Sequence, residues 1–311
     1  MNSRQAIAVV LSAIFFTIPV IAYSILLINV LILFFAFAIF AASWDLIFGY
    51  TGQLTLGQTF PYGLSGFVSA LLVTNYPVPW KINLGFNISP IAALLIGALA
   101  ATLASSVLAF PALRVKGNSL VIVSVATPLI VQQLFIKIWG EEGIPQVSHL
   151  VQDTVQLYYF GLVLTILVYL SLYWILRTSI GLRFRAIRED ELAAQTSGIN
   201  IVRYKFLAYS ISSFYAGLAG SYFTFFTSHA DPTMFSLSVM FQGASMVLVG
   251  GLGTLVGPLV GAFLLTFASG YLEYVSTYRL LLYAAAVIII IMFLPKGLMH
   301  PFLERFRRKA V

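Results

Sequence analysis

The chain has 311 residues, of which 60% are hydrophobic and only 9% charged, and its mean hydropathy is +0.97. A soluble domain carries about 25% charged residues, so the composition excludes that class and predicts an integral membrane protein. The net charge of +7 fits residues that set membrane topology better than a nucleic-acid surface. The chain has no cysteine, which excludes a disulfide framework and a thiolate metal or redox centre.

Long uncharged stretches predict membrane-spanning helices along the whole chain. Between Arg4 and Asp45, for example, no charged side chain occurs, which leaves room for at least one apolar span of about 20 residues. The expected spans are residues 6–22, 26–48, 61–76, 89–111, 118–137, 155–177, 206–226, 238–256, 258–275 and 279–295. We therefore expect an all-α polytopic membrane protein of about ten transmembrane helices, with residues 1–311 forming a single domain.

The basic residues predict the orientation of these spans. If the charged segment around residues 183–191 is cytoplasmic, alternation of the spans places 14 of the 17 Lys and Arg residues on the inner side and three, Lys81, Lys137 and Arg279, on the outer side. Cytoplasmic loops carry an excess of Lys and Arg, so both termini are predicted to be cytoplasmic.

The stretch GYTGQLTLGQ, residues 49–58, interrupts the second apolar block. Its glycines weaken a helix, and its polar side chains offer hydrogen-bonding groups; those side chains are Thr51, Gln53, Thr55 and Gln58. Broken helices are tolerated in a membrane where protein or a water-filled cavity supplies the missing partners, which predicts a substrate pathway here. A plain cytoplasmic turn is the alternative.

Asp45 is the one charged residue deep in an early span. An ionisable residue within a membrane segment indicates a polar pathway or a buried hydrogen-bond network. Because Asp45 lies near the end of its span, it is also placed to reach the interface.

A second interruption, VGGLGTLVGPLVGA, lies near the other end of the chain and includes Gly250, Gly251 and Gly253. Two interrupted hydrophobic segments in opposite halves of a chain indicate a transport site between them. Because Gly253, Gly257 and Gly261 recur at four-residue spacing, tight helix packing is an equal alternative, and both readings can hold. In the span 206–226, Ser213, Gly217 and Ser221 form a small-residue stripe that predicts close packing.

The charged loop of residues 178–205 is far longer than a connector needs. Residues 186–197 are expected to form a short helix that ends at Gly198, with Asn200 capping the next membrane helix. Such a helix, with Arg188 to Glu191 exposed, fits the groove of a partner; a merely solvated loop is the alternative. No G-x-x-x-x-G-K-[ST] motif is present, so ATP-driven work requires another chain.

Three segments resemble the LivM-type permease subunits of ABC importers for branched-chain amino acids. They are ASWDLIFGYTGQLTLGQ at 42–58, LRFRAIREDELAAQTSGINIVRYKFLAYSISSFYAGLAG at 182–220 and MVLVGGLGTLVGPLVGA at 246–262, and ALRVKGNSLVIVSVATP at 112–128 looks similar too. The resemblance implies a cytoplasmic coupling helix, with coupling residues Arg188, Glu189, Asp190, Glu191, Ala193, Ala194 and Gly198.

The resemblance also implies partners and a location. It implies a cell-membrane heterodimer with a second related permease, two ABC ATPase subunits that bind the ATP, and an extracytoplasmic substrate-binding protein. No cofactor or metal is expected on this chain. By implication, leucine, isoleucine or valine passes to the cytoplasm by alternating access along a pathway that includes the polar residues of 49–58, Asp45 and the three glycines of the second interruption.

Two stretches depart from the family pattern: IWGEEGIPQVSHL at 138–150, and TFPYGLSG at 59–66, where Pro61 is unusual. They leave urea, short amides and other amino acids open as solutes. A stand-alone secondary transporter is the rival from another class, with Asp45 as its only support. A membrane enzyme would need a cluster of His, Asp or Glu that the sequence does not offer.

Overall fold

The computed structural model describes residues 16–17, 19, 24–74, 88–112, 118–147, 150–151, 153–272, 292 and 297–298. Within these residues the chain is helical, apart from connecting segments and one isolated β-bridge. The elements are α2 (Ile25–Asp45), η1 (Leu46–Tyr50), α3 (Thr59–Val73), α4 (Pro90–Ala112), α5 (Asn118–Trp139), α6 (Thr154–Arg177), α7 (Ser179–Glu189), α8 (Glu191–Thr196), α9 (Ile201–Thr227), η2 (Pro232–Phe235), α10 (Leu237–Gly250) and α11 (Gly257–Leu272).

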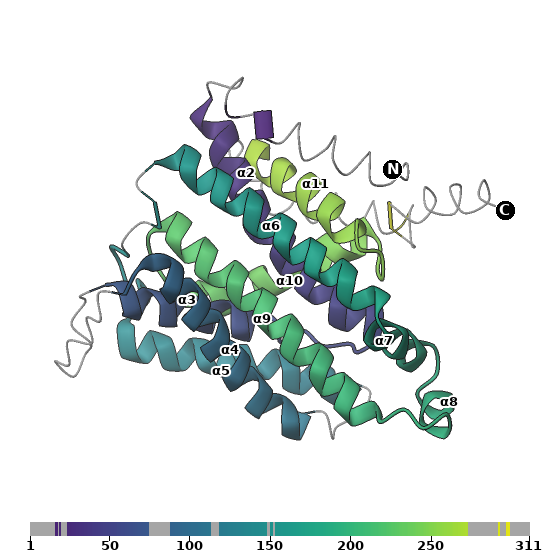
Figure 1. Cartoon of the computed structure of the whole chain (residues 1–311). Helices are drawn as coiled ribbons and strands as arrows, with labels where there is room; N and C mark the ends of the chain where they lie inside the picture. Colours follow the sequence, from purple (N-terminus) through teal and green to yellow (C-terminus); the bar gives the residue numbers. More distant parts are fainter. Residues whose placement is uncertain are drawn as a thin grey trace.

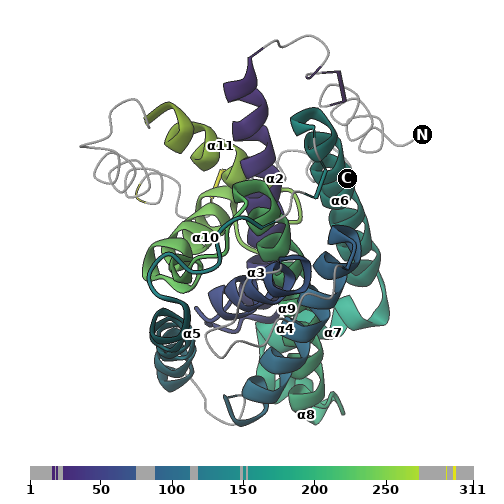
Figure 2. The same ribbon diagram turned by 90° about the vertical axis from the view of Figure 1, so that its left-hand side faces the viewer.

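Helix α2 is the centre of the bundle (Figures 1 and 2). Every residue from 34 to 47 is buried, as expected for a helix that is apolar on all sides. Around it pack α6, α9, α10 and α11. The last turn of α2 continues into η1, a short π-helix that ends at Tyr50, so the first Gly-rich interruption begins inside the bundle.

Small residues let α9 approach α3 and α4 closely, which confirms the predicted packing stripe. A Cβ atom at Gly217 would lie 2.9 Å from the Cα of Ala98 in α4. The hydroxyls of Ser221 and Ser69 are 2.7 Å apart, which joins α9 to α3. Interfaces between membrane helices depend on such close backbone approach and on interhelical hydrogen bonds.

The outer faces of α4, α5 and α6 expose large apolar side chains, among them Leu103, Ile122 and Trp174. Among the described helices, four are long and apolar enough to cross a membrane: Ile25–Tyr50, Pro90–Ala109, Leu120–Trp139 and Thr154–Arg177. The chain therefore has the architecture of an all-helical membrane protein, as the sequence predicts.

Most described helices match the expected spans, with one clear correction. The span predicted at 238–256 is wrong at its end, because α10 ends at Gly250 and residues 251–256 form a connecting segment. With 14 residues and 1.5 Å per residue, α10 is only about 21 Å long, shorter than the ~30 Å hydrocarbon core. The expected spans 6–22 and 279–295 lie outside the described residues, apart from isolated positions.

Candidate functional site

The two Gly-rich interruptions, 200 residues apart in the sequence, meet at Asp45. The Oδ1 atom of Asp45, the last residue of α2, accepts a hydrogen bond of 2.7 Å from the backbone N–H of Gly253. A Cβ atom at Gly49 would lie 1.9 Å from that oxygen and 2.4 Å from the Gly253 nitrogen, so only glycine fits there. Asp45 is 2% exposed and belongs to a buried hydrogen-bond network, one of the two roles expected for it.

The segment after η1 keeps its polar side chains inside the protein. Thr51, Gln53 and Thr55 are buried, although Gly52 and Leu54 between them are exposed. The hydroxyl of Thr51 donates to the carbonyl of Ile47 at 2.7 Å, and the Gln53 amide donates to Thr51 at 3.0 Å. An exposed cytoplasmic turn would place such side chains in solvent, so the buried arrangement favours the alternative of a polar segment inside the bundle.

Gln58 is fully buried, and neither its amide nitrogen nor its amide oxygen has a hydrogen-bond partner among the residues that the structure describes. Trp44, Thr59 and Tyr62 close to it in the chain each carry a buried polar atom in the same situation. Buried polar groups are normally paired with protein or water. This part of α2 and α3 therefore offers unused donors and acceptors at the bundle centre.

A cavity lies between the first interruption and α4, α5 and α9. Its empty space, including the part open to solvent, is about 440 Å³. The residues that line it are Gln53, Thr55, Gly57, Leu108, Ala109, Leu120, Val123, Ser124, Thr127 and Tyr209. Ser124 also accepts a 2.9 Å hydrogen bond from the backbone N–H of Leu56, which ties α5 to the interruption.

Of the sequence-predicted pathway residues, the cavity therefore brings together only Gln53 and Thr55. Asp45 lines a separate, smaller space of about 190 Å³ beside α6 and α11. Ser124, Thr127 and Tyr209 were missed by sequence reasoning, since hydroxyl groups on apolar helices carry no signal of what they face.

The second interruption is used mainly for packing. A Cβ atom at Gly250 would lie 1.9 Å from the carbonyl oxygen of Gly257, and one at Gly261 would lie 1.9 Å from that of Met246. Helices α10 and α11 thus contact one another backbone to backbone, which confirms the packing alternative for these glycines. Gly251 packs against Gly297. Neither Gly250 nor Gly251 lines the 440 Å³ cavity.

The charged loop folds as two helices and not as the single helix predicted at 186–197. The chain turns between α7 and α8 at Asp190, whose carboxyl group accepts hydrogen bonds from the N–H groups of Leu192 and Ala193 at 2.8 and 3.1 Å. An aspartate whose side chain caps a new helix has a non-helical backbone conformation, so the preceding helix cannot continue through it. The predicted caps are confirmed: Gly198 follows α8 with φ +81°, and Asn200 accepts from the N–H of Arg203 at 3.0 Å.

The predicted coupling residues are not all free to contact a partner. Glu189, Asp190 and Ala193 are exposed, Ala194 is buried, and no atom lies within 4 Å of a Cβ built on Gly198. Glu191 is half-buried, contrary to expectation, because it forms an ion pair with Lys205 of α9. Leu192 of α8, which sequence reasoning missed, is 74% exposed and is an apolar side chain of the kind that docks into a groove.

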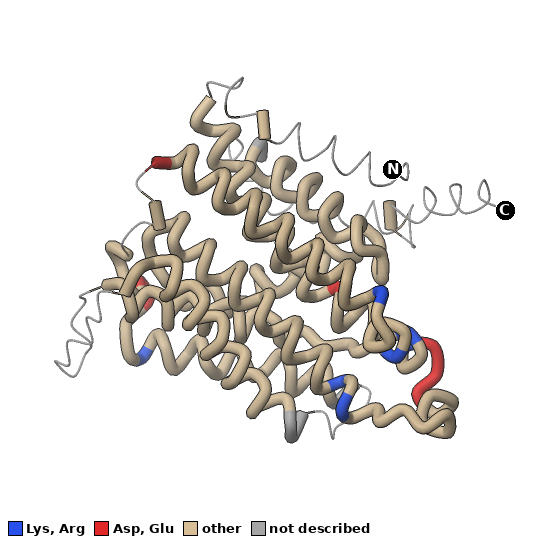
Figure 3. The backbone as a smooth tube through the Cα atoms, viewed as in Figure 1, with Lys and Arg blue, Asp and Glu red and all other residues tan. Residues whose placement is uncertain are grey.

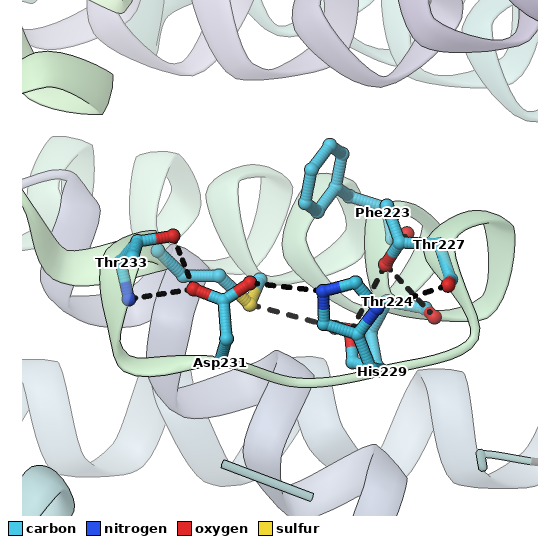
Figure 4. A network of polar contacts seen from close by, with 7 residues as sticks. Phe223, Thr224, Thr227, His229, Asp231 and Thr233 are labelled. Carbon is cyan, nitrogen blue, oxygen red and sulfur yellow. Dashed lines mark hydrogen bonds and ion pairs between the residues drawn. The ribbon is translucent and has the colours of Figure 1, made fainter. Parts of the chain in front are cut away.

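Basic residues gather on α7 and on the adjoining ends of α6 and α9, as Figure 3 shows. At the opposite end, the loop after α9 holds a polar network (Figure 4). His229 and Asp231 form an ion pair of 3.3 Å, Asp231 accepts from the N–H of Thr233 at 2.7 Å, and the Thr227 hydroxyl donates to the His229 carbonyl at 3.0 Å. This network was not predicted, because His229 has no recognisable motif around it.

Both departures from the family pattern meet this loop. Ile144 and Ala230 exchange backbone hydrogen bonds of 2.8 and 3.0 Å, and a Cβ atom at Gly63 would strike the ring of Phe235. Pro61 stands in the first turn of α3, where a missing N–H leaves no hydrogen bond unmade. Among the described residues, no group of three or more His, Cys, Asp or Glu side chains is placed to hold a metal ion.

Comparison with known proteins finds permease proteins among those similar to this chain. The chain is 27% identical to the high-affinity branched-chain amino acid transport system permease protein LivM of Escherichia coli and 28% identical to that of Salmonella typhimurium, in each case over 82% of this chain. It spans 65% of the length of those two proteins. The ribose import permease protein RbsC of Escherichia coli is 33% identical over 40% of this chain and 41% of its own. The guanosine ABC transporter permease protein NupQ of Bacillus subtilis is 31% identical over 36% of this chain and 34% of its own.

No solved structure matches the chain. The family model described as the branched-chain amino acid transport system / permease component matches residues 26–294, which include both interruptions and the α7–α8 helix pair. Its members are transport subunits and not enzymes. The chain therefore belongs to the branched-chain amino acid transport system permease component family.

Proposed function

We propose that this chain is a membrane subunit of an ABC importer that carries leucine, isoleucine or valine into the cytoplasm. The observation that carries this proposal is the family match over residues 26–294, within which the named LivM relatives align with most of the chain. The relatives named for ribose and guanosine align with about 40% of the chain or less, so they support the coarser function of an ABC permease more than their own solutes.

The α7–α8 end is the cytoplasmic end in this proposal. Six basic residues belong to this end: Arg177, Arg183, Arg185, Arg188, Arg203 and Lys205. Lys137 belongs to the last turn of α5, where Phe135 packs against Phe235 of η2, at the other end of α9. The excess of basic residues on cytoplasmic loops supports this orientation in a plasma membrane. The network around Asp231 then faces outward, where a substrate-binding protein delivers the solute.

ATPase subunits contact the α7–α8 pair. Helix α8 projects from the bundle (Figure 1), whereas α7 packs on it through Phe184 and Ile187. The exposed Leu192 with its charged neighbours gives α8 an apolar centre and a polar rim, which is the usual anatomy of an interface. The second related permease completes the transmembrane part of the assembly, and the apolar outer faces of α4, α5 and α6 are available to it and to lipid.

The solute passes the first interruption on its way inward. Gln53 and Thr55 line the cavity between that interruption and α5, and Gln58 offers an unpaired amide deeper in the bundle. These groups are suited to transient contacts, because a pathway must bind a polar solute weakly enough to release it. The leucine and valine side chains of the cavity suit an aliphatic solute.

A reconstitution experiment tests the assembly and the solute together. The chain is placed in vesicles with the second permease, the ATPases and the binding protein that co-purify with it, and uptake of labelled leucine, ribose, guanosine and urea is compared with and without ATP. ATP-dependent leucine uptake by the assembly, and none by the chain alone, is the expected result. Ion-driven uptake by the chain alone would instead establish the secondary transporter, and uptake of another solute would replace leucine as the cargo.

The ATPase contact is tested at Leu192. Replacing Leu192 by serine removes a side chain that supports little of the fold, so the subunit is expected to remain folded while co-purification of the ATPases falls. Leu182→Ser is the matched control, because Leu182 of α7 is similarly exposed but belongs to no predicted contact. Equal loss in both variants, or in neither, would argue against docking through α8.

A further inference from the structure

Arg188 belongs to the charged loop and is exposed, yet its side chain lies against one glycine of each Gly-rich interruption. A Cβ atom at Gly253 would lie 2.2 Å from its Nη1 atom, and one at Gly52 would lie 3.3 Å from its Cγ atom. Both glycines have positive φ angles, +71° and +68°, which other residues rarely adopt. The backbone at both breaks is therefore shaped to leave room for the Arg188 side chain.

The same place holds the buried Asp45. Its carboxyl group has one hydrogen bond, from the Gly253 N–H, and the positive charge of Arg188 acts on it from nearby. The ion pairs formed among the described residues are Lys205–Glu191 and His229–Asp231, so Arg188 acts on Asp45 through space. A carboxyl group in a membrane segment is costly unless its charge is compensated, and the nearby Arg188, together with the Gly253 N–H, offsets part of that cost.

Arg188 lies close to the turn between α7 and α8, so movement of this helix pair would reach its side chain directly. It stands in the last turn of α7, two residues before Asp190 starts α8. Phe184 and Ile187 bury the inner face of α7, so the helix moves as a unit with the packing beneath it. Arg185 on the same helix is exposed, as Arg188 is, but it lies over the Tyr50 ring, 5.7 Å from its centroid, and not against Gly253.

We propose that Arg188 is a positioning residue that links the α7–α8 pair to the break at Asp45 and Gly253. Displacement of the pair by a partner then moves both interruptions together, and the cavity beside the first one changes with them. This role rests on the proposed function and replaces the ATPase contact that the family resemblance implies for Arg188. The Arg188 side chain lies against Gly52 and Gly253, and its charge acts on Asp45.

The first test measures solute uptake per ATP hydrolysed in the complete reconstituted importer. Arg188→Gln is expected to lower this ratio about tenfold, within the roughly 5–150-fold range of typical coupling between sites, while ATP hydrolysis continues. Arg185→Gln, the matched control on the same helix, is expected to keep the wild-type ratio. The double variant Asp45→Asn, Arg188→Gln is expected to lower the uptake ratio no further than the more damaging single variant does, because both changes remove the same interaction.

The second test needs no change at Arg188. The chain has no cysteine, so Leu54→Cys and Leu182→Cys, both at exposed positions, can carry spin labels on the first interruption and on α7. Their separation is expected to stay constant between nucleotide-free and ATP-bound importer, because the two segments move together. In Arg188→Gln the separation is expected to change with nucleotide.

Two results would overturn the inference. One is an uptake ratio in Arg188→Gln equal to that of Arg185→Gln; the other is a label separation that changes with ATP while Arg188 is present. If Arg188→Gln fails to assemble, the label measurement in the otherwise unaltered chain decides alone. Failure of the proposed function is distinguishable, because the unaltered importer would then show no ATP-dependent uptake.

Discussion

The two Gly-rich interruptions share a sequence signature but use their glycines differently. In the first, residues 49–58, the backbone leaves the helix, and buried polar side chains remain, including the unpaired Gln58. In the second, Gly250 and Gly261 remove side chains so that α10 and α11 touch through their backbones. Glycine in a membrane helix is therefore an ambiguous signal, and the polar residues beside it distinguish an open site from a packed one.

This difference predicts opposite consequences for stability and transport. Changes at the packed glycines of the second interruption should unfold the subunit, whereas changes at the polar side chains of the first should spare the fold and reduce uptake. The following variants test that contrast, from the largest expected effect to the smallest.

Gly261→Val should cause the largest loss. Its Cβ would lie 1.9 Å from the Met246 carbonyl oxygen, so α10 and α11 must separate. Overpacking alone costs typically about 1–3 kcal/mol, and a clash with backbone exceeds that range. Thermal unfolding of the detergent-extracted subunit measures it. Gly270→Ala is the control, since its Cβ would meet only the side chain of Val30; equal losses in both would refute the packing role.

Gln58→Leu should reduce uptake about tenfold, equivalent to ~1.4 kcal/mol, without lowering the melting temperature. Its amide has no hydrogen-bond partner in the described part of the chain, so an apolar replacement of similar size removes a buried polar group and breaks no bond found there. Initial uptake rates and thermal unfolding are measured on the same preparation. Gln58→Asn, which keeps an amide, should retain more uptake. A Gln58→Leu variant with a lower melting temperature and normal uptake would contradict the difference expected between the two interruptions.

Ser124→Ala should have a moderate effect on both properties. The Ser124 hydroxyl accepts the Leu56 N–H, so its loss leaves that donor unpaired at a cost of about 1 kcal/mol. Uptake should fall only severalfold, since α5 is held less firmly against the cavity. Thr127→Val is the comparison, because Thr127 lines the same cavity but bonds only within α5. A larger stability loss in Thr127→Val would argue against the link.

Lys205→Gln, which lies in neither interruption, should change stability least. Its ion pair with Glu191 is partly exposed to solvent, and such pairs contribute about 0–1 kcal/mol. The expected melting temperature is near that of the unaltered subunit. A loss comparable to that of Gly261→Val would mean that the α7–α8 pair, and not the helix contact, limits stability.

The sequence predicts the helical architecture well, because α2, α4, α5 and α6 are long apolar blocks whose composition alone requires a membrane. Capping signals also hold locally, at Gly198 and Asn200. The end of α10 was placed wrongly because residues 251–256 remain apolar, and hydropathy does not show that Gly251 and Gly253 adopt positive φ.

The candidate site is only half predictable for a related reason. Polar residues beside glycines mark Gln53 and Thr55, but Ser124 and Tyr209 reach the cavity through tertiary packing, which no local pattern encodes. From the sequence, Asp45 is assigned to the substrate pathway and Arg188 to the ATPase contact, without any relation between the two. Their proximity depends on the meeting of segments more than 140 residues apart, and only the fold brings those together.

The short α10 has an electrical consequence. A helix of 14 residues covers only about two thirds of a ~30 Å hydrocarbon layer, so the connecting segment of residues 251–256 follows within the remaining depth. Arg188 lies against Gly253 of that segment. Moving a charge across the membrane potential is worth about 2.3 kcal/mol per 100 mV, so a displacement of the Arg188 charge along the membrane normal is expected to appear as voltage-dependent uptake.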